Sequence, residues 1–335
     1  MRAEQATATA TDDYVPEPWR VRDPRAAAGL SREIRALARR RNAILLAHNY
    51  QVPEVQETAD FVGDSLGLAL EAQRAGAELI VFCGVHFMAE SAKILNPDKT
   101  VLLPNLSAGC ALADSITPES LLQWKERYPD HAVVTYINSS AEVKALSDIC
   151  CTSANAVSVV KSLAERKILF TPDRNLGRWV ARQVPEKEIV VYDGACPTHD
   201  VLRDASVARL RTERPEAVVI AHPECREDVL AIADEVCSTS GMIAAVERHP
   251  EARVFIIATE WALIHQLRKR YPGREFVAAD GCIGCRLHCP YMKMISLESV
   301  RRSLIETVFP IEVDPEDAAG ARRALERMMA VPRDR

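Results

Sequence analysis

The stretch Ala43–Tyr50 reads AILLAHNY, an apolar run that ends in two polar rings, His48 and Tyr50, two positions apart. So short a continuous apolar run is typical of a buried β-strand. Residues two apart in an extended chain point to the same side, so His48 and Tyr50 are predicted to face one space.

The same pattern occurs twice more along the chain. AVVTYIN ends in Tyr136 and Asn138, and AVVIAHPE ends in His222 and Glu224. At a spacing of 17 residues from the first member of each pair, a hydroxyl residue opens a helical pattern; these residues are Ser65, Ser153 and Thr239. Three equal spacings indicate an internal repeat of about 87 residues.

Each repeat continues with a second apolar strand, a helical stretch and a third strand, which predicts a β-α-α-β-α-β unit. Short continuous apolar strands are typical of a small parallel sheet covered by helices on both faces, so the predicted fold class is α/β. We expect three similar domains at residues 29–118, 119–206 and 207–312, after a flexible arm at 1–28. A helix at 314–331 is expected to dock on the first domain.

The polar pairs and hydroxyl residues all lie at strand ends or helix starts, where sites form in parallel α/β units. Three units around a pseudo-threefold axis would direct these groups into one central cavity. Just past its third strand every repeat also reaches cysteine: Cys110, Cys196, and the run Cys282, Cys285 and Cys289.

One cysteine per repeat predicts a centre with three thiolates, which suits a [4Fe–4S] cluster with one iron left open. The local run Cys282–Cys289 alone would also suit zinc or a ferredoxin-like cluster. Ser65 precedes Cys110 by 45 residues and Ser153 precedes Cys196 by 43, while Cys282 lies 43 after Thr239. Spacing therefore favours Cys282, but loops tolerate insertions and the choice within the run stays open.

The remaining composition is that of an ordinary soluble protein, with 48% hydrophobic and 27% charged residues and a net charge of −5. This balance gives no reason to expect nucleic acid as a partner, and no apolar run is long enough for a membrane span. The N-terminus has no secretory pattern, so we expect a cytoplasmic protein. Five cysteines are expected only to pack: Cys83, Cys150, Cys151, Cys225 and Cys237.

Several long motifs resemble the quinolinate synthase family over about residues 30–310, among them LLAHNYQVPEVQETADFVGDSL, AGCALADS, GACPTH, STSGM and CPYMKMISLE. The resemblance implies three Rossmann-like domains with pseudo-threefold symmetry and a [4Fe–4S] cluster on one cysteine per domain. It assigns the third ligand to Cys289, with Cys110 and Cys196 as the others. Cys282 and Cys285 are then extra thiols, either unpaired or joined in a reversible disulfide.

The family condenses iminoaspartate with dihydroxyacetone phosphate to quinolinate in NAD biosynthesis, a transferase reaction that releases phosphate and two waters. The resemblance implies binding residues at eight positions: His48, Ser65, Tyr136, Asn138, Ser153, His222, Glu224 and Thr239. We expect His222 and Glu224 to move protons, with His48 and Tyr50 as second candidates and Tyr136 as an acid. His199, three residues after Cys196, is close enough to reach the surroundings of the cluster.

The source of the imine stays open between an L-aspartate oxidase and an aspartate dehydrogenase. The alternative function is a redox, electron-transfer or zinc protein that uses Cys282, Cys285 and Cys289.

Overall fold

The structure, a computed structural model, describes residues 15–282 and 285–334, and its strands form three parallel sheets of four strands each. The first sheet has the order β2 (Phe61–Gly63), β1 (Ala43–His48), β3 (Leu79–Cys83), β4 (Thr100–Leu102). The second has the order β6 (Ile149–Cys151), β5 (Ala132–Tyr136), β7 (Lys167–Thr171), β8 (Glu188–Val191). The third has the order β10 (Glu235–Val236), β9 (Val218–Ala221), β11 (Val254–Ala258), β12 (Glu275–Ala278).

The order of strands is the same in all three sheets, with the second strand of each unit at one edge and the fourth at the other. The predicted repeat had three strands per unit and missed the short edge strands β2, β6 and β10. Each of these ends two or three residues before the hydroxyl residue and pairs in parallel with the first strand of its unit. They are two or three residues long, which is too short to leave a periodic pattern in the sequence.

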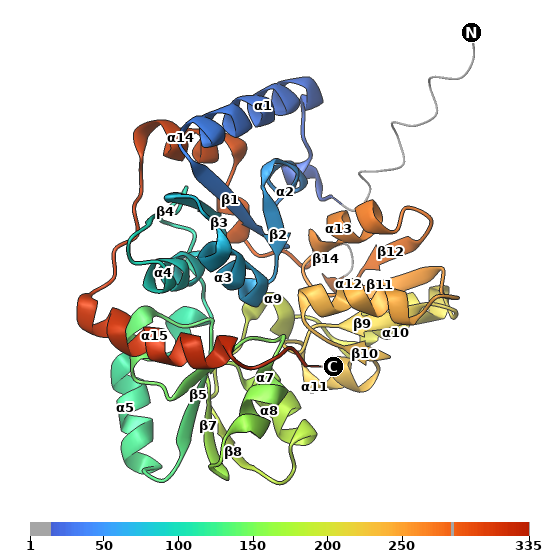
Figure 1. The fold of residues 1–335 in the computed structure, drawn as a ribbon. Helices are drawn as coiled ribbons and strands as arrows, with labels where there is room; N and C mark the ends of the chain where they lie inside the picture. Colours follow the sequence, from blue (N-terminus) through green and yellow to red (C-terminus); the bar gives the residue numbers. More distant parts are fainter. Residues whose placement is uncertain (1–14, 283–284, 335) are drawn as a thin grey trace.

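Helices cover the sheets, and Figure 1 shows the three units as separate blue, green and yellow-to-orange parts of the molecule. The helices are α1 (Pro24–Arg40), α2 (Pro53–Thr58), α3 (Ser65–Arg74), α4 (His86–Leu95), α5 (Pro118–Arg127), α6 (Ala141–Ala145), α7 (Ala156–Ser162), α8 (Arg174–Gln183), α9 (Pro197–Asp200), α10 (Asp204–Glu213), α11 (Glu227–Ala231), α12 (Thr239–Arg248), α13 (Leu263–Arg270), α14 (Leu297–Glu306) and α15 (Pro315–Met329). Three 3₁₀ turns, η1 (Glu17–Trp19), η2 (Ala113–Ser115) and η3 (Met292–Met294), and a two-stranded ribbon, β13 (Asp280–Cys282) and β14 (Cys285–Arg286), complete the described elements.

The central strands form the core of each unit. Every residue of β3, β5 and β11 is buried, as expected for strands with helices on both faces. The sheets occupy residues 43–102, 132–191 and 218–278, so each lies inside one predicted segment. The boundaries of those segments stay a prediction.

The last helix, α15, packs across two units. It lies against α6 and β6 of the second unit and also against α4 of the first, on which the sequence predicted it would dock. Figure 1 shows this helix, in red, next to α4 and the green second unit. The approach to α6 is close because residue 320 is glycine: a Cβ there would lie 2.8 Å from the Cβ of Ala145.

None of the helices in residues 15–282 and 285–334 combines the length and the apolarity that crossing a lipid bilayer requires.

Candidate functional site

All twelve site residues singled out in the sequence line one cavity, together with nine further residues. From the first unit come His48, Tyr50, Ser65 and Cys110, from the second Tyr136, Asn138, Ser153 and Cys196, and from the third His222, Glu224, Thr239 and Cys289. Parallel strands bring their carboxyl ends to one edge of a sheet, and β1, β5 and β9 each end at or next to a cavity residue. The structure therefore gathers in one place groups that lie up to 241 positions apart in the chain.

The second member of each polar pair lies past the end of its strand in a turn or bend, and not in extended chain as the sequence had suggested. β1 ends at His48, and the backbone N–H of Tyr50 donates to Nδ1 of His48 at 3.1 Å. This bond folds the chain back after the strand and sets the two rings edge to face, 4.7 Å apart. Both rings still line the cavity because the turn itself forms part of its wall.

The hydroxyl residues sit at or near helix starts. Ser65 and Thr239 are the first residues of α3 and α12, which begin after the capping residues Asp64 and Ser238. Ser153 lies three residues before α7, which starts at Ala156, so its position differs slightly from the predicted helix start.

Cys110, Cys196 and Cys289 share one local geometry. Each is followed within three residues by a short helix or turn: η2, α9 or η3. The backbone N–H of Ala113, three positions after Cys110, hydrogen-bonds to the cysteine sulfur at 3.5 Å, and the backbone N–H groups of His199 and Met292, at the same position after Cys196 and Cys289, act to lower the pKa of those thiols. Such N–H groups favour a negatively charged sulfur, as in low-pKa thiols at helix starts.

Burial acts on these three thiols in the opposite direction. It raises the pKa of Cys110 to about 12 and that of Cys289 to about 11, and it also raises the pKa of Cys196. Thiols in this environment become thiolates when a metal replaces the proton. The repeated N–H donors and the soft donor atoms thus fit a metal centre held by three cysteines.

Position, and not pKa, distinguishes these cysteines from the others described. Burial also raises the pKa of Cys83, Cys150, Cys151, Cys225 and Cys237, but none of these lines the cavity. The side chains of Cys282 and Cys285 lie outside the described residues, so the predicted disulfide between them has no structural test here.

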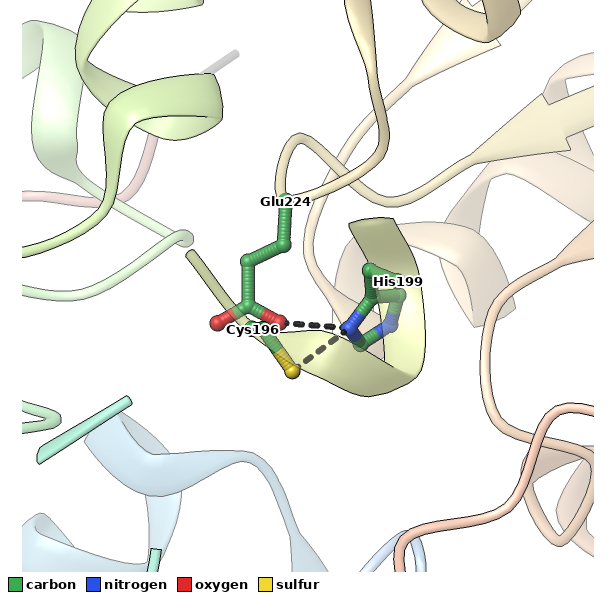
Figure 2. A group of neighbouring side chains, drawn as sticks. All are labelled: Cys196, His199 and Glu224. Atoms are coloured by element: carbon green, nitrogen blue, oxygen red, sulfur yellow. Dashed lines mark hydrogen bonds and ion pairs between the residues drawn. The ribbon is translucent and has the colours of Figure 1, made fainter. Parts of the chain in front are cut away.

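A tighter group lies at one side of the cavity, where Figure 2 shows one ring nitrogen of His199 facing both Glu224 and Cys196. Nδ1 of His199 is 2.8 Å from Oε2 of Glu224 and 3.3 Å from Sγ of Cys196. Among the described residues this is the one group whose ligand atoms all lie within 4.8 Å of one another, as a single metal ion requires. The sulfurs of Cys110 and Cys289 are not part of this group.

At pH 7 the buried acid of the cavity, Glu224, is ionised, and the buried bases His48 and His222 are neutral. Burial lowers the pKa of His48 to about 4 and also lowers that of His222, so both imidazoles are neutral at pH 7. Burial alone would raise the pKa of Glu224, but His199 and His222 more than offset it and hold this pKa well below its usual value. Glu224 is therefore ionised, with His222 at 3.4 Å, and Nε2 of His222 lies 3.2 Å from Oγ of Ser153.

The two tyrosines of the cavity remain protonated. Burial, followed by the charge of Glu224, raises the pKa of Tyr50 and of Tyr136 well above the usual value. The Tyr50 hydroxyl hydrogen-bonds to Oγ1 of Thr259, which lies 2.8 Å from Nε2 of His199. A continuous hydrogen-bonded path thus runs from Tyr50 through Thr259 and His199 to Glu224.

A buried ion pair lies behind Cys289, and the sequence had not pointed to it. Nζ of Lys293 is 2.6 Å from Oε1 of Glu260, and both side chains are at most 2% exposed. Lys293 also donates to the backbone carbonyl of Tyr50, and Oε1 of Glu260 accepts the backbone N–H of Cys289 at 3.4 Å. In the second unit, the carboxylate of Asp173 likewise accepts the backbone N–H of Cys196 at 3.1 Å.

One signal could have revealed these two carboxylates. Asp173 and Glu260 both lie two residues beyond the second long strand of their units, β7 and β11. An acidic residue at the same place in two repeats is the kind of regularity that had identified the polar pairs. Lys293 stands in the CPYMK motif, but its partners cannot be read from the sequence.

Comparison with known proteins shows the family of the chain. Residues 32–330 match the family described as quinolinate synthetase A protein. A quinolinate synthase of Geobacter metallireducens is 54% identical over 306 residues, which cover 91% of this chain and 98% of the relative. Those of Methanosarcina barkeri and Thermodesulfovibrio yellowstonii are 49% and 48% identical, over 91% and 89% of this chain and 98% and 97% of the relatives. The chain therefore belongs to the quinolinate synthetase A family.

Proposed function

We propose that the protein is a quinolinate synthase, a transferase that condenses iminoaspartate with dihydroxyacetone phosphate to give quinolinate, one phosphate and two waters. The atoms balance with no oxidant or reductant. The observation that carries the proposal is the convergence of twelve side chains from three sheets on one cavity, in a chain whose relatives bear this name. The reaction would supply the pyridine ring for NAD biosynthesis in the cytoplasm, with the imine coming from an L-aspartate oxidase or an aspartate dehydrogenase.

We also propose that Cys110, Cys196 and Cys289 hold a [4Fe–4S] cluster, with the three units in a pseudo-threefold arrangement about it. The repeated short helix or turn after each cysteine supports this assignment, as do the backbone N–H groups three positions on, which favour the thiolate form. When bound, such a cluster supplies a Lewis-acidic iron that helps a hydroxyl group to leave.

Substrate binding is assigned to the hydroxyl and amide groups of the cavity. The substrates carry carboxylates and a phosphate, yet none of the described residues that line the cavity is a lysine or an arginine. Ser65 and Thr239 at helix starts, with Ser153, Tyr136 and Asn138, would therefore hold these anions through hydrogen bonds and helix dipoles. Oδ1 of Asn138 is buried and has no hydrogen-bond partner among the described residues, which leaves it free for a substrate N–H or O–H.

Proton transfer is assigned to His222 and Glu224, with His48 and Tyr50 in support. Ionised Glu224 and neutral His222 can accept protons at pH 7, while protonated Tyr50 and Tyr136 can donate them. The path through Thr259 and His199 gives Tyr50 and Glu224 a route for sharing a proton.

The first test is an anaerobic assay for quinolinate from the two substrates, with iron and sulfide measured in the same samples. Cys110→Ser, Cys196→Ser and Cys289→Ser are expected to lose the cluster and all activity. Cys282→Ser, Cys285→Ser and the matched control Cys237→Ser should retain both. Retention of iron and sulfide without Cys110 or Cys196 would contradict the assignment and favour a redox centre on the Cys282–Cys289 run.

The second candidate is a zinc-dependent lyase that uses Cys196, His199 and Glu224, which lie close enough for a single ion. Against it, Nδ1 of His199 is already paired with Oε2 of Glu224 at 2.8 Å, although Oε1 of Glu224 is buried without a hydrogen-bond partner among the described residues. Stoichiometric zinc without sulfide in the purified active protein would favour this candidate.

A further inference from the structure

The segment that follows α15 reaches the wall of the cavity. Figure 1 shows the red end of the chain pointing to the place where the three coloured units meet. The described part of this segment, Val331–Asp334, lies beyond residue 330, where the match to the family ends. No sequence motif predicts a role for Pro332–Asp334.

Arg333 forms a bidentate ion pair with Asp64 through the two terminal nitrogens of its guanidinium group. Its Nη1 and Nη2 lie 2.5 and 2.9 Å from the two carboxylate oxygens of Asp64. Asp64 is only 5% exposed, lines the cavity, and caps α3 by accepting the N–H of Gly67 at 2.8 Å. Ser65, a proposed binding residue, follows Asp64 directly.

Asp334 holds the start of α7 in the second unit. Its carboxylate accepts the N–H groups of Val157 and Ser158 at 3.1 and 2.7 Å, and its own N–H donates to the carbonyl of Ala154. The segment before it is anchored by buried Asn155, whose amide donates to the carbonyl of Val331 at 3.4 Å. Ser153 of the cavity stands immediately before Ala154.

The segment Pro332–Asp334 therefore binds to the starts of α3 and α7, which come from different units and lie next to Ser65 and Ser153 of the cavity.

The same segment also changes the charge of the cavity wall. Asp64 would present a full negative charge beside a site for anionic substrates, and the bidentate Arg333 neutralises it. A second groove beside the cavity shares Ser153 with it and is lined by Pro332, Arg333 and Asp334.

We propose that the C-terminal segment Pro332–Asp334 is a positioning element of the substrate site, in which Arg333 neutralises and fixes Asp64 and Asp334 fixes the start of α7. Arg333 acts through Asp64 and does not itself line the cavity. The expected changes in KM rest on the proposed function, whereas the expected changes at the starts of α3 and α7 do not.

The experiment compares the full chain with Arg333→Met and with a chain that ends at Val331. The imine is formed in the assay from oxaloacetate and ammonia, and quinolinate is measured anaerobically. Arg333→Met is expected to raise KM for both substrates about tenfold while kcat changes less than about threefold, because an unpaired Asp64 repels both anions. Arg333→Lys keeps the charge but not the bidentate contact, and should recover part of the loss.

Hydrogen exchange gives a readout that needs no catalysis. In the chain that ends at Val331, the amides of Gly67, Val157 and Ser158 should exchange faster, while the amides of β5 and β11 should not change. The matched control is Arg323→Met: Arg323 is exposed on α15 and bonds only to the carbonyl of Ala319 on its own helix. It should leave KM, kcat and exchange unchanged.

The possible results separate the two proposals. Unchanged exchange at all three amides overturns the positioning role, whether or not quinolinate forms. Faster exchange with an unchanged KM also overturns it, because the tail would then only stabilise the helices. A variant that loses both kcat and its bound iron would show that the segment has only a general structural role, and this result would overturn the positioning role. Failure of the full chain to form quinolinate overturns the proposed function, and the exchange result then decides the role of the tail alone.

Discussion

His48 shows how burial sets the chemistry of a single residue in this cavity. It is 5% exposed and has a pKa of about 4, so the folded protein keeps it neutral where the unfolded chain protonates it. Because the unfolded state binds the extra proton, stability is lost as the pH falls from about 6.5 towards 4. At 1.36 kcal/mol per pKa unit, this residue accounts for a loss of roughly 3 kcal/mol.

His48→Asn is therefore expected to reduce the acid sensitivity of the fold. The Asn amide oxygen can accept the N–H of Tyr50 as Nδ1 of His48 does, but the side chain has no proton to gain. The free energy of unfolding, measured in urea from pH 7 to pH 4, should fall less steeply in the variant by roughly 3 kcal/mol in total. Parallel curves of unfolding free energy against pH for the parent and the variant would contradict this account. The control is His288→Asn, because His288 is exposed.

Whether a contact of a site residue could be predicted depends on how far along the chain its partner lies. The polar pairs could be predicted because each stands at the end of its own apolar strand, and the sequence alone places it there. Arg333 and Asp64 could not, because 269 positions separate them and neither has a local pattern. The same holds for Lys293 and Tyr50, which are 243 positions apart.

At the scale of elements, the contact between α15 and α6 depends on one glycine. A Cβ at position 320 would lie 2.8 Å from the Cβ and 2.9 Å from the Cα and carbonyl oxygen of Ala145. These are backbone and short side-chain atoms that cannot rotate away, so a larger residue would push the helices apart.

Gly320→Val should destabilise the protein by about 3 kcal/mol, the upper part of the usual range for overpacking. Urea unfolding at pH 7 measures this. The comparison is Gly29→Ala in α1, where a Cβ would meet only Arg32 Nη2 at 3.9 Å and the better helix propensity of Ala should stabilise by up to about 1 kcal/mol. Equal stability of Gly320→Val and the parent would show that α15 does not depend on this contact.

The elements themselves were predictable to different degrees. The long strands of each unit have continuous apolar sequences, and all three were found in all three units. The edge strands β2, β6 and β10 exist only through pairing with their neighbours, so no local signal marks them. The placement of α15 depended on surfaces of α4 and α6 that form only in the folded protein.

At the scale of the whole molecule, the pair Glu260–Lys293 joins the third unit to the first. Lys293 contacts the carbonyl of Tyr50, its charge lies 4.4 Å from the ring centre of Trp261, and Glu260 holds the backbone of Cys289. Removing one partner would leave a buried charge without compensation, which costs far more than losing the pair.

Lys293→Met is accordingly expected to destabilise the protein by about 3–5 kcal/mol and to accelerate loss of iron from the purified protein. The double variant Lys293→Met with Glu260→Leu should recover much of the stability, but not the slow loss of iron, because removal of Glu260 leaves the backbone N–H of Cys289 without its acceptor. Thermal unfolding and iron release to a chelator measure the two effects. A double variant no more stable than Lys293→Met would contradict the argument.

The contribution of one cysteine from each successive repeat also has a consequence for biosynthesis. During translation Cys110 and Cys196 leave the ribosome well before Cys289. The proposed cluster needs all three thiols, so it could be completed only after the third repeat has been synthesised.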